Sequence, residues 1–195
     1  MGKTKSDLKE ESILIQRAKT DPEAFGVLYE RYVDRIYNYV YYRTGNAADA
    51  EDLTARIFER AIKHIGNYKD QGVPFSAWLY RIAHNLVANW HRDNSRKKEI
   101  PLDDGYNVSY LGDQPEAAIL KTEEQEKLLV LIRQLPPDRQ QLLILKFVEH
   151  LPNVEIGQIM GRTEGAIKSL YHRTLLSLRE KNRKKDVKRN GKGKL

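Results

Sequence analysis

The sequence predicts an all-α fold of two small helical domains joined by an irregular acidic linker, with the C-terminal domain a helix-turn-helix domain. Three observations lead to this prediction. Apolar residues recur at helical spacing, strand-like alternation is absent, and roughly 28 residues in the middle of the chain lack a periodic pattern. We therefore expect domains over 7–93 and 122–180, a flexible linker over 94–121 and a basic disordered tail over 181–195.

The first domain is predicted to contain a helix that starts at Asp21-Pro22, an acidic cap followed by proline at the first helical position. Residues 44–46 (Thr-Gly-Asn) end it, and Asn46 can cap a second helix. A third helix, from Phe75 to Arg92, has apolar residues on one face and polar residues on the other. The apolar stripes of these three helices comprise Phe25, Leu28, Tyr29, Tyr32, Ile36 and Val40; Ala50, Leu53, Ile57, Ala61 and Ile65; and Phe75, Trp78, Leu79, Ile82, Leu86, Val87 and Trp90.

Four tyrosines cluster at positions 37, 39, 41 and 42. Such rings can stack on the bases of a nucleic acid. They can also cover a helix end and close a hydrophobic core, which is the commoner use of an aromatic run. The sequence leaves both interpretations open and favours the second.

The second domain is predicted to resume at a capping box, Thr-Glu-Glu-Gln over 122–125, and to break at Pro136-Pro137. Residues 142–148 are apolar nearly all round, which predicts a central helix. A short helix over 154–160 follows. The turn at 161–163 then leads into a longer helix that begins at Glu164, with Thr163 as its N-cap.

The short helix, the glycine-containing turn and the longer amphipathic helix form a predicted helix-turn-helix. In this motif the start of the second helix enters the major groove of DNA. Arginine and lysine suit guanine edges and phosphates, serine and histidine suit shorter contacts, and a glycine lets the backbone approach closely. The residues expected to face DNA are Arg162, Glu164, Gly165, Lys168, Ser169, His172 and Arg173. The alternative is an ordinary helical hairpin.

Composition and motifs argue against other functions. The chain has no cysteine, which excludes disulfides, thiolate metal sites and a thiol nucleophile. It has no nucleotide-binding glycine motif and no catalytic constellation, and its five histidines are scattered. We therefore expect no enzyme, no metal, no cofactor and no small-molecule substrate. No apolar run approaches the roughly 18 residues that span a bilayer, which predicts a cytoplasmic protein without membrane insertion.

The net charge of +7 lies entirely in the tail. Residues 179–195 carry nine Lys and Arg against two acids, so residues 1–178 sum to zero. Within that balanced part the net charge is −4 over 21–54, +4 over 55–92 and −6 over 99–127. Blocks of one sign are often solvated, but a basic stretch between two acidic ones suits an anionic nucleic acid.

Four stretches in this order resemble the sigma factors of bacterial RNA polymerase, in the small extracytoplasmic-function (ECF) class that keeps only regions 2 and 4. They are AFGVLYERYVDRIYNYV (24–40), DAEDLTARIFERAI (49–62), FSAWLYRIAHNLVANWHR (75–92) and IGQIMGRTEGAIKSLYHR (156–173). The resemblance covers about 10–93 and 122–180, and it implies a protein that directs polymerase to promoters and helps to melt the −10 region.

The resemblance also implies three sets of site residues. For the core polymerase they are Asp49, Glu51, Asp52, Leu53, Arg56, Phe58 and Glu59. For the −10 element, read as flipped bases of a melted strand, they are Lys69, Asp70, Tyr80, Arg81, Asn85, Asn89 and Arg92. For the −35 duplex they are Arg162, Thr163, Glu164, Gly165, Lys168, Ser169, His172 and Arg173.

The partners implied are core RNA polymerase, through the clamp helices of its largest subunit and the flap of its second-largest subunit, together with promoter DNA and an anti-sigma factor. The location implied is the bacterial cytoplasm, on the nucleoid when the chain is in holoenzyme. Two positions depart from the family pattern. Ala55-Arg56-Ile57 stands where Gln-Glu-Thr is usual, and Leu170 stands where arginine is frequent. The alternative function is a helix-turn-helix repressor or activator that acts without joining the polymerase.

Overall fold

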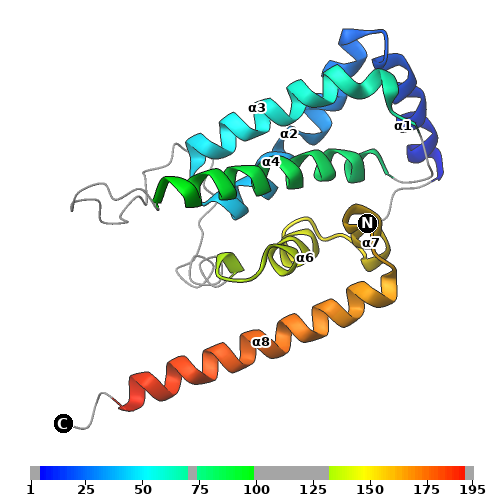
Figure 1. Cartoon of the computed structure of the whole chain (residues 1–195). Coiled ribbons are helices and arrows are strands. Elements are labelled where there is room, and N and C mark those ends of the chain that lie inside the picture. Colours follow the sequence, from blue (N-terminus) through cyan, green and yellow to red (C-terminus); the bar gives the residue numbers. More distant parts are fainter. Residues whose placement is uncertain (1–4, 70–73, 99–131, 192–195) are drawn as a thin grey trace.

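The computed structural model describes residues 5–69, 74–98 and 132–191, with side chains over 9–69, 74–94 and 132–180. Within these ranges every regular element is a helix, which confirms the predicted fold class (Figure 1). The helices are α1 (Lys5–Ala18), α2 (Pro22–Thr44), α3 (Ala47–His64), the short 3-10 helix η1 (Ile65–Asn67), α4 (Phe75–Lys98), α6 (Pro137–Phe147), α7 (Asn153–Met160) and α8 (Glu164–Gly191). None of the helices in this part of the chain is both long and apolar enough to cross a membrane.

The start and end of α2 lie where the sequence predicts them. The Asp21 carboxylate accepts a hydrogen bond from the backbone N–H of Glu23 at 3.0 Å, and Pro22 occupies the first turn. Gly45 ends the helix with φ at 76°, a left-handed conformation that glycine adopts without steric cost. The next helix, α3, is capped as expected by Asn46, whose side-chain oxygen accepts from the backbone N–H of Asp49 at 2.9 Å.

Helices α1 to α4 form the first domain, and α2, α3 and α4 pack around its core (Figure 1). The predicted apolar stripes supply this core, with one exception. Tyr29 is 42% exposed, and its ring lies against the edge of Phe58 at a centroid distance of 4.8 Å. Tyr29 follows Leu28 on the helix, so it falls at the margin of the buried face rather than within it.

One tyrosine of the cluster is buried in the core, and the other three are half-buried at its margin. The ring of Tyr39 is fully buried and meets that of Tyr80 edge-on at 5.2 Å. Tyr37, Tyr41 and Tyr42 pack against the core from its margin. The structure therefore supports the core interpretation of the cluster over base stacking.

Helix α1 is absent from the sequence prediction. Its inner face carries Ile15 and Ala18 together with Glu11, which is only 3% exposed. The hydroxyl of Tyr32 donates a hydrogen bond to the Glu11 carboxylate, so the buried acid has a partner. An acid at a core-facing position interrupts the apolar stripe, and this explains why periodicity did not reveal the helix.

In the second domain, α6 carries the buried run Leu142–Leu145 and α7 and α8 form the helix-turn-helix. Gly161 ends α7 with φ at 65°, and the Thr163 hydroxyl accepts from the backbone N–H of Ala166 at 3.2 Å to cap α8. These caps match the predicted turn and the predicted N-cap. The turn of the helix-turn-helix and the start of its second helix therefore lie where the sequence predicts them.

Two predicted boundaries are wrong. Helix α4 continues to Lys98, past the expected start of the linker at 94, because neither glycine nor proline interrupts residues 93–98. Helix α8 likewise continues to Gly191, although we expected disorder from 181, since Arg, Lys and Glu are good helix formers and no breaker occurs before Gly191. The remaining linker residues 99–121 and the capping box at 122–125 lie outside the described residues.

The two domains contact each other. Helix α7 packs against α4, and α6 packs against α2 (Figure 1). The start of α6 also brings Asp138 and Gln141 toward the middle of α4. The predicted −10 helix therefore lies at the boundary between the domains.

Candidate nucleic-acid and polymerase interfaces

The start of α8 presents an uninterrupted polar face to solvent. All of the residues predicted for the −35 duplex are exposed, namely Arg162, Thr163, Glu164, Gly165, Lys168, Ser169, His172 and Arg173. Two of them form ion pairs at the surface: Lys168 Nζ lies 2.8 Å from Glu164 one turn earlier, and Arg162 pairs with Asp138 at the start of α6. Exposed pairs of this kind are weak and separate readily when a phosphate or base competes.

Gly157, which sequence reasoning missed, sets the geometry of the helix-turn-helix. Its carbonyl accepts from the backbone N–H of Arg162 at 2.8 Å, and a Cβ at this position would lie 2.6 Å from the Arg162 carbonyl oxygen. The turn therefore folds back onto α7 only because residue 157 has no side chain. A single glycine in a short apolar helix gives no sequence signal of this contact.

The inner face of α8 is apolar. Leu170, which stands where the family often has arginine, is 7% exposed and belongs to the core of the domain. The Thr174 hydroxyl, one turn later, is buried and donates to the Leu170 carbonyl at 2.7 Å. Position 170 therefore faces the core rather than DNA in this chain.

Helix α4 carries the predicted −10 residues on two different faces. Arg81, Asn85, Asn89 and Arg92 are exposed, as is Lys69 before the helix, whereas Asp70 lies outside the described residues. Tyr80 is only 1% exposed, so its predicted contact with DNA cannot form in this arrangement of the domains. Tyr80 stands between the apolar Leu79 and the polar Arg81, at the edge of the predicted apolar stripe, and the stripe did not include it.

The hydroxyl of Tyr80 donates a hydrogen bond to Glu149 of the second domain at 2.7 Å. The same carboxylate oxygen accepts from Arg35 Nε on α2 at 3.0 Å, and the Glu149 side chain is 4% exposed. Burial and the adjacent negative charge of Glu149 raise the pKa of the Tyr80 hydroxyl, so it keeps its proton and remains a donor. Neither Glu149 nor Arg35 was singled out by the sequence.

A buried cation lies beside α4 one helical turn after Tyr80. Arg43, at 1% exposure, donates from Nη1 to the Tyr39 hydroxyl at 2.8 Å and lies 3.2 Å from His84 Nδ1. Burial and the positive charge of Arg43 lower the pKa of His84, and burial followed by the same charge lowers the pKa of His91. Because arginine only donates, Nδ1 of His84 is the accepting, unprotonated nitrogen.

Helix α3 exposes acidic and basic side chains together. The exposed acids are Glu51, Asp52 and Glu59, and the exposed bases are Arg56, Arg60 and Lys63. Arg56 lies 3.5 Å from Asp52, and Lys63 lies 2.6 Å from Glu59. Leu53 and Phe58, which we predicted as polymerase contacts, are instead 1% and 5% exposed and support the helix from within the core. Asp49 is half-buried, and its carboxylate accepts from Trp90 Nε1 of α4 at 3.2 Å. The face available to a partner is therefore narrower than the sequence suggested.

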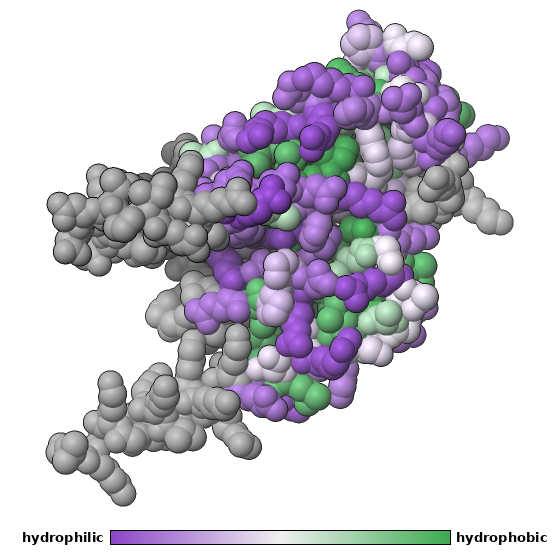
Figure 2. Space-filling model, viewed as in Figure 1, coloured by the Kyte–Doolittle hydropathy of each residue, from purple (hydrophilic) through white to green (hydrophobic). Residues whose placement is uncertain are grey.

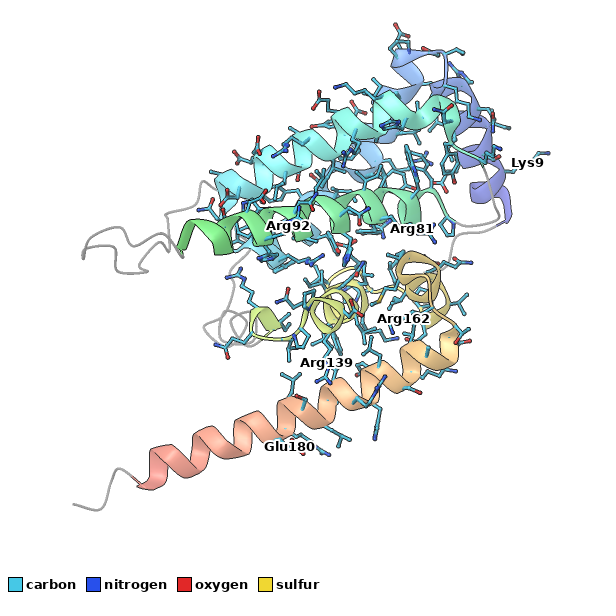
Figure 3. All side chains as sticks on the ribbon, viewed as in Figure 1. Lys9, Arg81, Arg92, Arg139, Arg162 and Glu180 are labelled. Carbon is cyan, nitrogen blue, oxygen red and sulfur yellow. The ribbon has the colours of Figure 1, made fainter. Side chains whose placement is uncertain are left out.

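A cavity of about 310 Å³ lies where the two domains meet. Arg81, His84 and Asn85 of α4 line one side of it, and Asp138, Gln141 and Arg162 line the other. Figure 3 shows Arg81 and Arg162 on facing sides of this boundary. Among the described residues, no group of three histidine or carboxylate side chains gathers to hold a metal ion.

The surface carries no single dominant apolar patch on the face shown in Figure 2, where hydrophilic residues prevail and apolar ones form small separate areas. Exposed large apolar side chains do occur on both domains, including Val27 and Ile62 in the first and Phe147 and Leu176 in the second. The interfaces that the geometry offers are thus mainly polar: the start of α8, the exposed part of α4 and the outer face of α3.

Comparison with known proteins bears on these surfaces. The family model of Sigma-70 region 2 matches residues 28–97, and that of Sigma-70 region 4 matches residues 125–178. The ECF RNA polymerase sigma factor BldN of Streptomyces coelicolor is 38% identical over 166 residues, which cover 85% of this chain and 63% of that protein. SigW of Bacillus subtilis, also an ECF RNA polymerase sigma factor, is 33% identical over 178 residues, which cover 86% of this chain and 94% of SigW.

Solved structures share the fold. CnrH, in a complex with the cytosolic domain of CnrY, matches with a TM-score of 0.64 at 18% identity over 86% of this chain and 94% of that one. The sigma factor RpoE of Bartonella quintana, in a complex with the anti-sigma factor NepR, matches with a TM-score of 0.59 at 17% identity over 80% of this chain and 94% of that one. The two matched regions and the relatives that span most of the sequence agree with each other: the chain belongs to the ECF family of RNA polymerase sigma factors.

Proposed function

We propose that this chain binds core RNA polymerase through the outer face of α3, reads the −35 element with the start of α8 and binds the melted −10 strand with α4. The single observation that carries the proposal is the polar face of α8, on which every predicted −35 residue is exposed immediately after a left-handed turn at Gly161. This is the geometry with which a helix-turn-helix reads the major groove.

Charge supports the assignment of α4 to the −10 strand. Residues 55–92 are net +4, and the exposed positions on α4 include Arg81 and Arg92, with Asn85 and Asn89 between them. Arginine attracts the phosphates of a single strand, and asparagine offers both a donor and an acceptor to the edge of a flipped base. The role of Tyr80 in this step would require that the second domain move away from α4.

The outer face of α3 is the surface proposed for the clamp helices of the largest polymerase subunit. Its exposed carboxylates belong to Glu51, Asp52 and Glu59, and basic side chains lie among them. Arg56 pairs with Asp52 and Lys63 with Glu59, so much of the negative charge of this face is compensated within the helix. We expect contact with polymerase to remain, with charge complementarity different from that of members that carry an acid at position 56.

The remaining partners follow from the family. A sigma factor acts where RNA polymerase is, so the proposed location is the bacterial cytoplasm. RpoE of Bartonella quintana binds the anti-sigma factor NepR, and an anti-sigma factor is therefore proposed for this chain as well. Promoter recognition is a binding function, so the proposal assigns no catalytic residue, metal or cofactor.

The test is to mix the purified chain with core polymerase, isolate the complex by size exclusion, and select promoters with it from random DNA. The expected result is a stable complex that enriches a two-part motif and gives runoff transcripts from it. A chain that binds duplex DNA alone but forms no complex with core polymerase would instead be a helix-turn-helix repressor or activator, and the proposal would fail.

A further inference from the structure

A carboxylate stands at the start of the helix that is proposed to read the −35 duplex. Glu164 is the first residue of α8, directly after the Thr163 cap, and its side chain is 44% exposed. Duplex DNA carries closely spaced negative phosphates, which repel an acid that approaches them. Glu164 therefore weakens DNA binding unless its carboxylate makes a favourable contact there.

The register of α8 places Glu164 on the face that is free to meet DNA. Residues one turn apart share a face of a helix, and the exposed face here comprises Glu164, Gly165, Lys168, Ser169, His172 and Arg173. The opposite face is buried at Ile167 and Leu170. A Cβ at Gly165, the next residue, would meet no atom within 4 Å, so the space beside Glu164 is open to a ligand.

Glu164 forms an ion pair within this face. Lys168 Nζ lies 2.8 Å from the Glu164 carboxylate oxygen Oε1, and the lysine side chain is 63% exposed. The pair exhausts neither group, because an ammonium has three donors and a carboxylate has about four acceptor sites. Lys168 therefore compensates the charge of Glu164 and holds its carboxylate on the exposed face, while both side chains keep the capacity to bond to DNA.

The edges of the bases leave a carboxylate few partners in the major groove. An ionised carboxylate only accepts hydrogen bonds, and guanine presents only acceptors in this groove. Adenine presents a donor beside an acceptor, which suits an amide side chain that both donates and accepts. Cytosine presents its N4 amino group as a donor without an acceptor of its own beside it. The base edge that best fits the carboxylate of Glu164 is therefore that of cytosine.

We propose that Glu164 determines specificity at one position of the −35 element: its carboxylate accepts a hydrogen bond from the N4 amino group of a cytosine, while Lys168 compensates its charge. The proposal rests on the proposed role of α8 in −35 binding. The alternative role of Glu164 is structural, since the helix dipole favours an acid in the first turn. A structural acid affects only stability, whereas an acid that contacts a base affects which base is selected.

The first measurement selects promoters from random DNA with holoenzyme made from each chain. The natural chain should enrich cytosine at one −35 position. Glu164→Gln should enrich adenine there instead, because glutamine bonds to both N6 and N7 of adenine, and Glu164→Ala should enrich no base at that position. The rest of the −35 and −10 motifs should stay the same. Glu23→Gln, the same change at an exposed position in the first turn of α2, is the matched control and should select the natural motif.

The result of this selection distinguishes the role of Glu164 from the proposed function of the chain. If holoenzyme with the natural chain enriches no two-part motif, both are overturned. If it enriches a two-part motif that is unchanged in Glu164→Gln and Glu164→Ala, the base contact of Glu164 is overturned and promoter recognition stands. Circular dichroism should show the same helical content in every chain, so that a changed motif reflects the contact and not misfolding.

The second measurement removes the donated hydrogen from the DNA instead of the acceptor from the protein. N4-methylcytosine still pairs with guanine, but its methyl group replaces the amino hydrogen that faces the major groove. With this base at the selected position of a −35 duplex, the natural chain should bind about 5- to 150-fold more weakly, the cost of one mismatched base pair. Glu164→Ala should bind the modified and unmodified duplexes alike. Equal losses in the two chains would mean that Glu164 does not contact this amino group, and the proposal would be overturned.

Discussion

The two proposed DNA surfaces of this chain are in opposite states. The start of α8 is exposed along its whole polar face, with only local ion pairs to displace. The corresponding face of α4 is partly covered, with Tyr80 buried and Arg81 bonded to α7. The difference teaches that a polar helix face identifies a surface suited to nucleic acid but does not establish that the surface is free.

Duplex DNA and a melted strand make different demands on a protein surface. Duplex DNA offers a rigid groove to a preformed helix, so the start of α8 needs no rearrangement before it docks. A melted strand must be captured from a duplex, and a permanently open basic face would bind any nucleic acid without regard to sequence. On α4 the guanidinium of Arg81 is held by the Gln158 carbonyl, whereas the corresponding side chains at the start of α8 make no backbone contact with the described part of the first domain.

Disrupting the turn that holds the start of α8 should have the largest effect on stability and on −35 duplex binding. Gly157→Ala places a methyl group 2.6 Å from the Arg162 carbonyl oxygen, and this backbone cannot move without opening the turn. We expect the free energy of unfolding to fall by about 3 kcal/mol, at the upper end for overpacking, and specific −35 duplex binding to be lost. Thermal unfolding and fluorescence anisotropy with a −35 duplex measure the two effects.

The control for this substitution is Gly165→Ala, since a Cβ at position 165 meets no atom within 4 Å. In this exposed helical position alanine should be as stable as glycine or more stable by about 0.5–1 kcal/mol. If both variants unfold alike, close approach at residue 157 is not what shapes the turn.

Removing single contacts from α8 should have the next largest effect. Lys168→Ala and Arg173→Ala should each weaken −35 duplex binding by about 1–3 kcal/mol if these side chains touch base edges, and should relax sequence preference at one position. Arg179→Ala, also exposed but farther along the helix, should change affinity little. An equal loss on all duplex sequences would mean that the residue contacts phosphate alone.

The basic end of α8 should contribute without regard to sequence. Residues 182–195 carry seven Lys and Arg, and each cation that contacts a phosphate adds about 0.9 to the slope of log affinity against log salt. Deleting them should lower that slope by up to about 6 and leave promoter preference intact. Binding measured at several salt concentrations tests this, and equal slopes with and without the segment would refute a role in DNA binding.

The smallest expected effect is that of His84, on α4, on how the free energy of unfolding depends on pH. Burial and Arg43 lower the pKa of His84 in the folded chain, so the unfolded chain binds the proton first as pH falls. The stability that neutral His84 contributes is therefore complete above its ordinary pKa of about 6.5 and is lost as pH falls through the lower folded value. His84→Asn should reduce the loss of stability between pH 7.5 and pH 5.5, measured by denaturant titration, and an unchanged pH dependence would contradict this assignment.

Local features were predictable because they depend on neighbouring residues. The caps at Asp21, Asn46 and Thr163 each satisfy a backbone N–H within three residues, and the structure has all three. The order of helices in the helix-turn-helix and the exposed face of α8 follow from the same short-range rules. Helix α1 escaped prediction because Glu11, a buried acid, stands where the pattern needs an apolar residue.

Burial within the predicted sites was not predictable in the same way. Leu53, Phe58 and Tyr80 belong to motifs that suggest contact with a partner, yet each is buried in this chain. For Leu53 and Phe58 the cause is the core of the first domain itself, since they lie on the inner face of α3. For Tyr80 the ring packs on Tyr39 of the same domain, and the hydroxyl bonds to Glu149, which is 69 residues away in sequence.

The sequence by itself determined the helices, their caps, the helix-turn-helix and the placement of charge, because these depend on periodicity and on contacts within a few residues. Only the tertiary structure decided that α4 is covered, that Glu149 joins the two domains and that Gly157 allows the turn to close. Each of these depends on groups that become neighbours only when helices pack. A buried hydrogen bond between distant residues leaves no periodic trace in either segment.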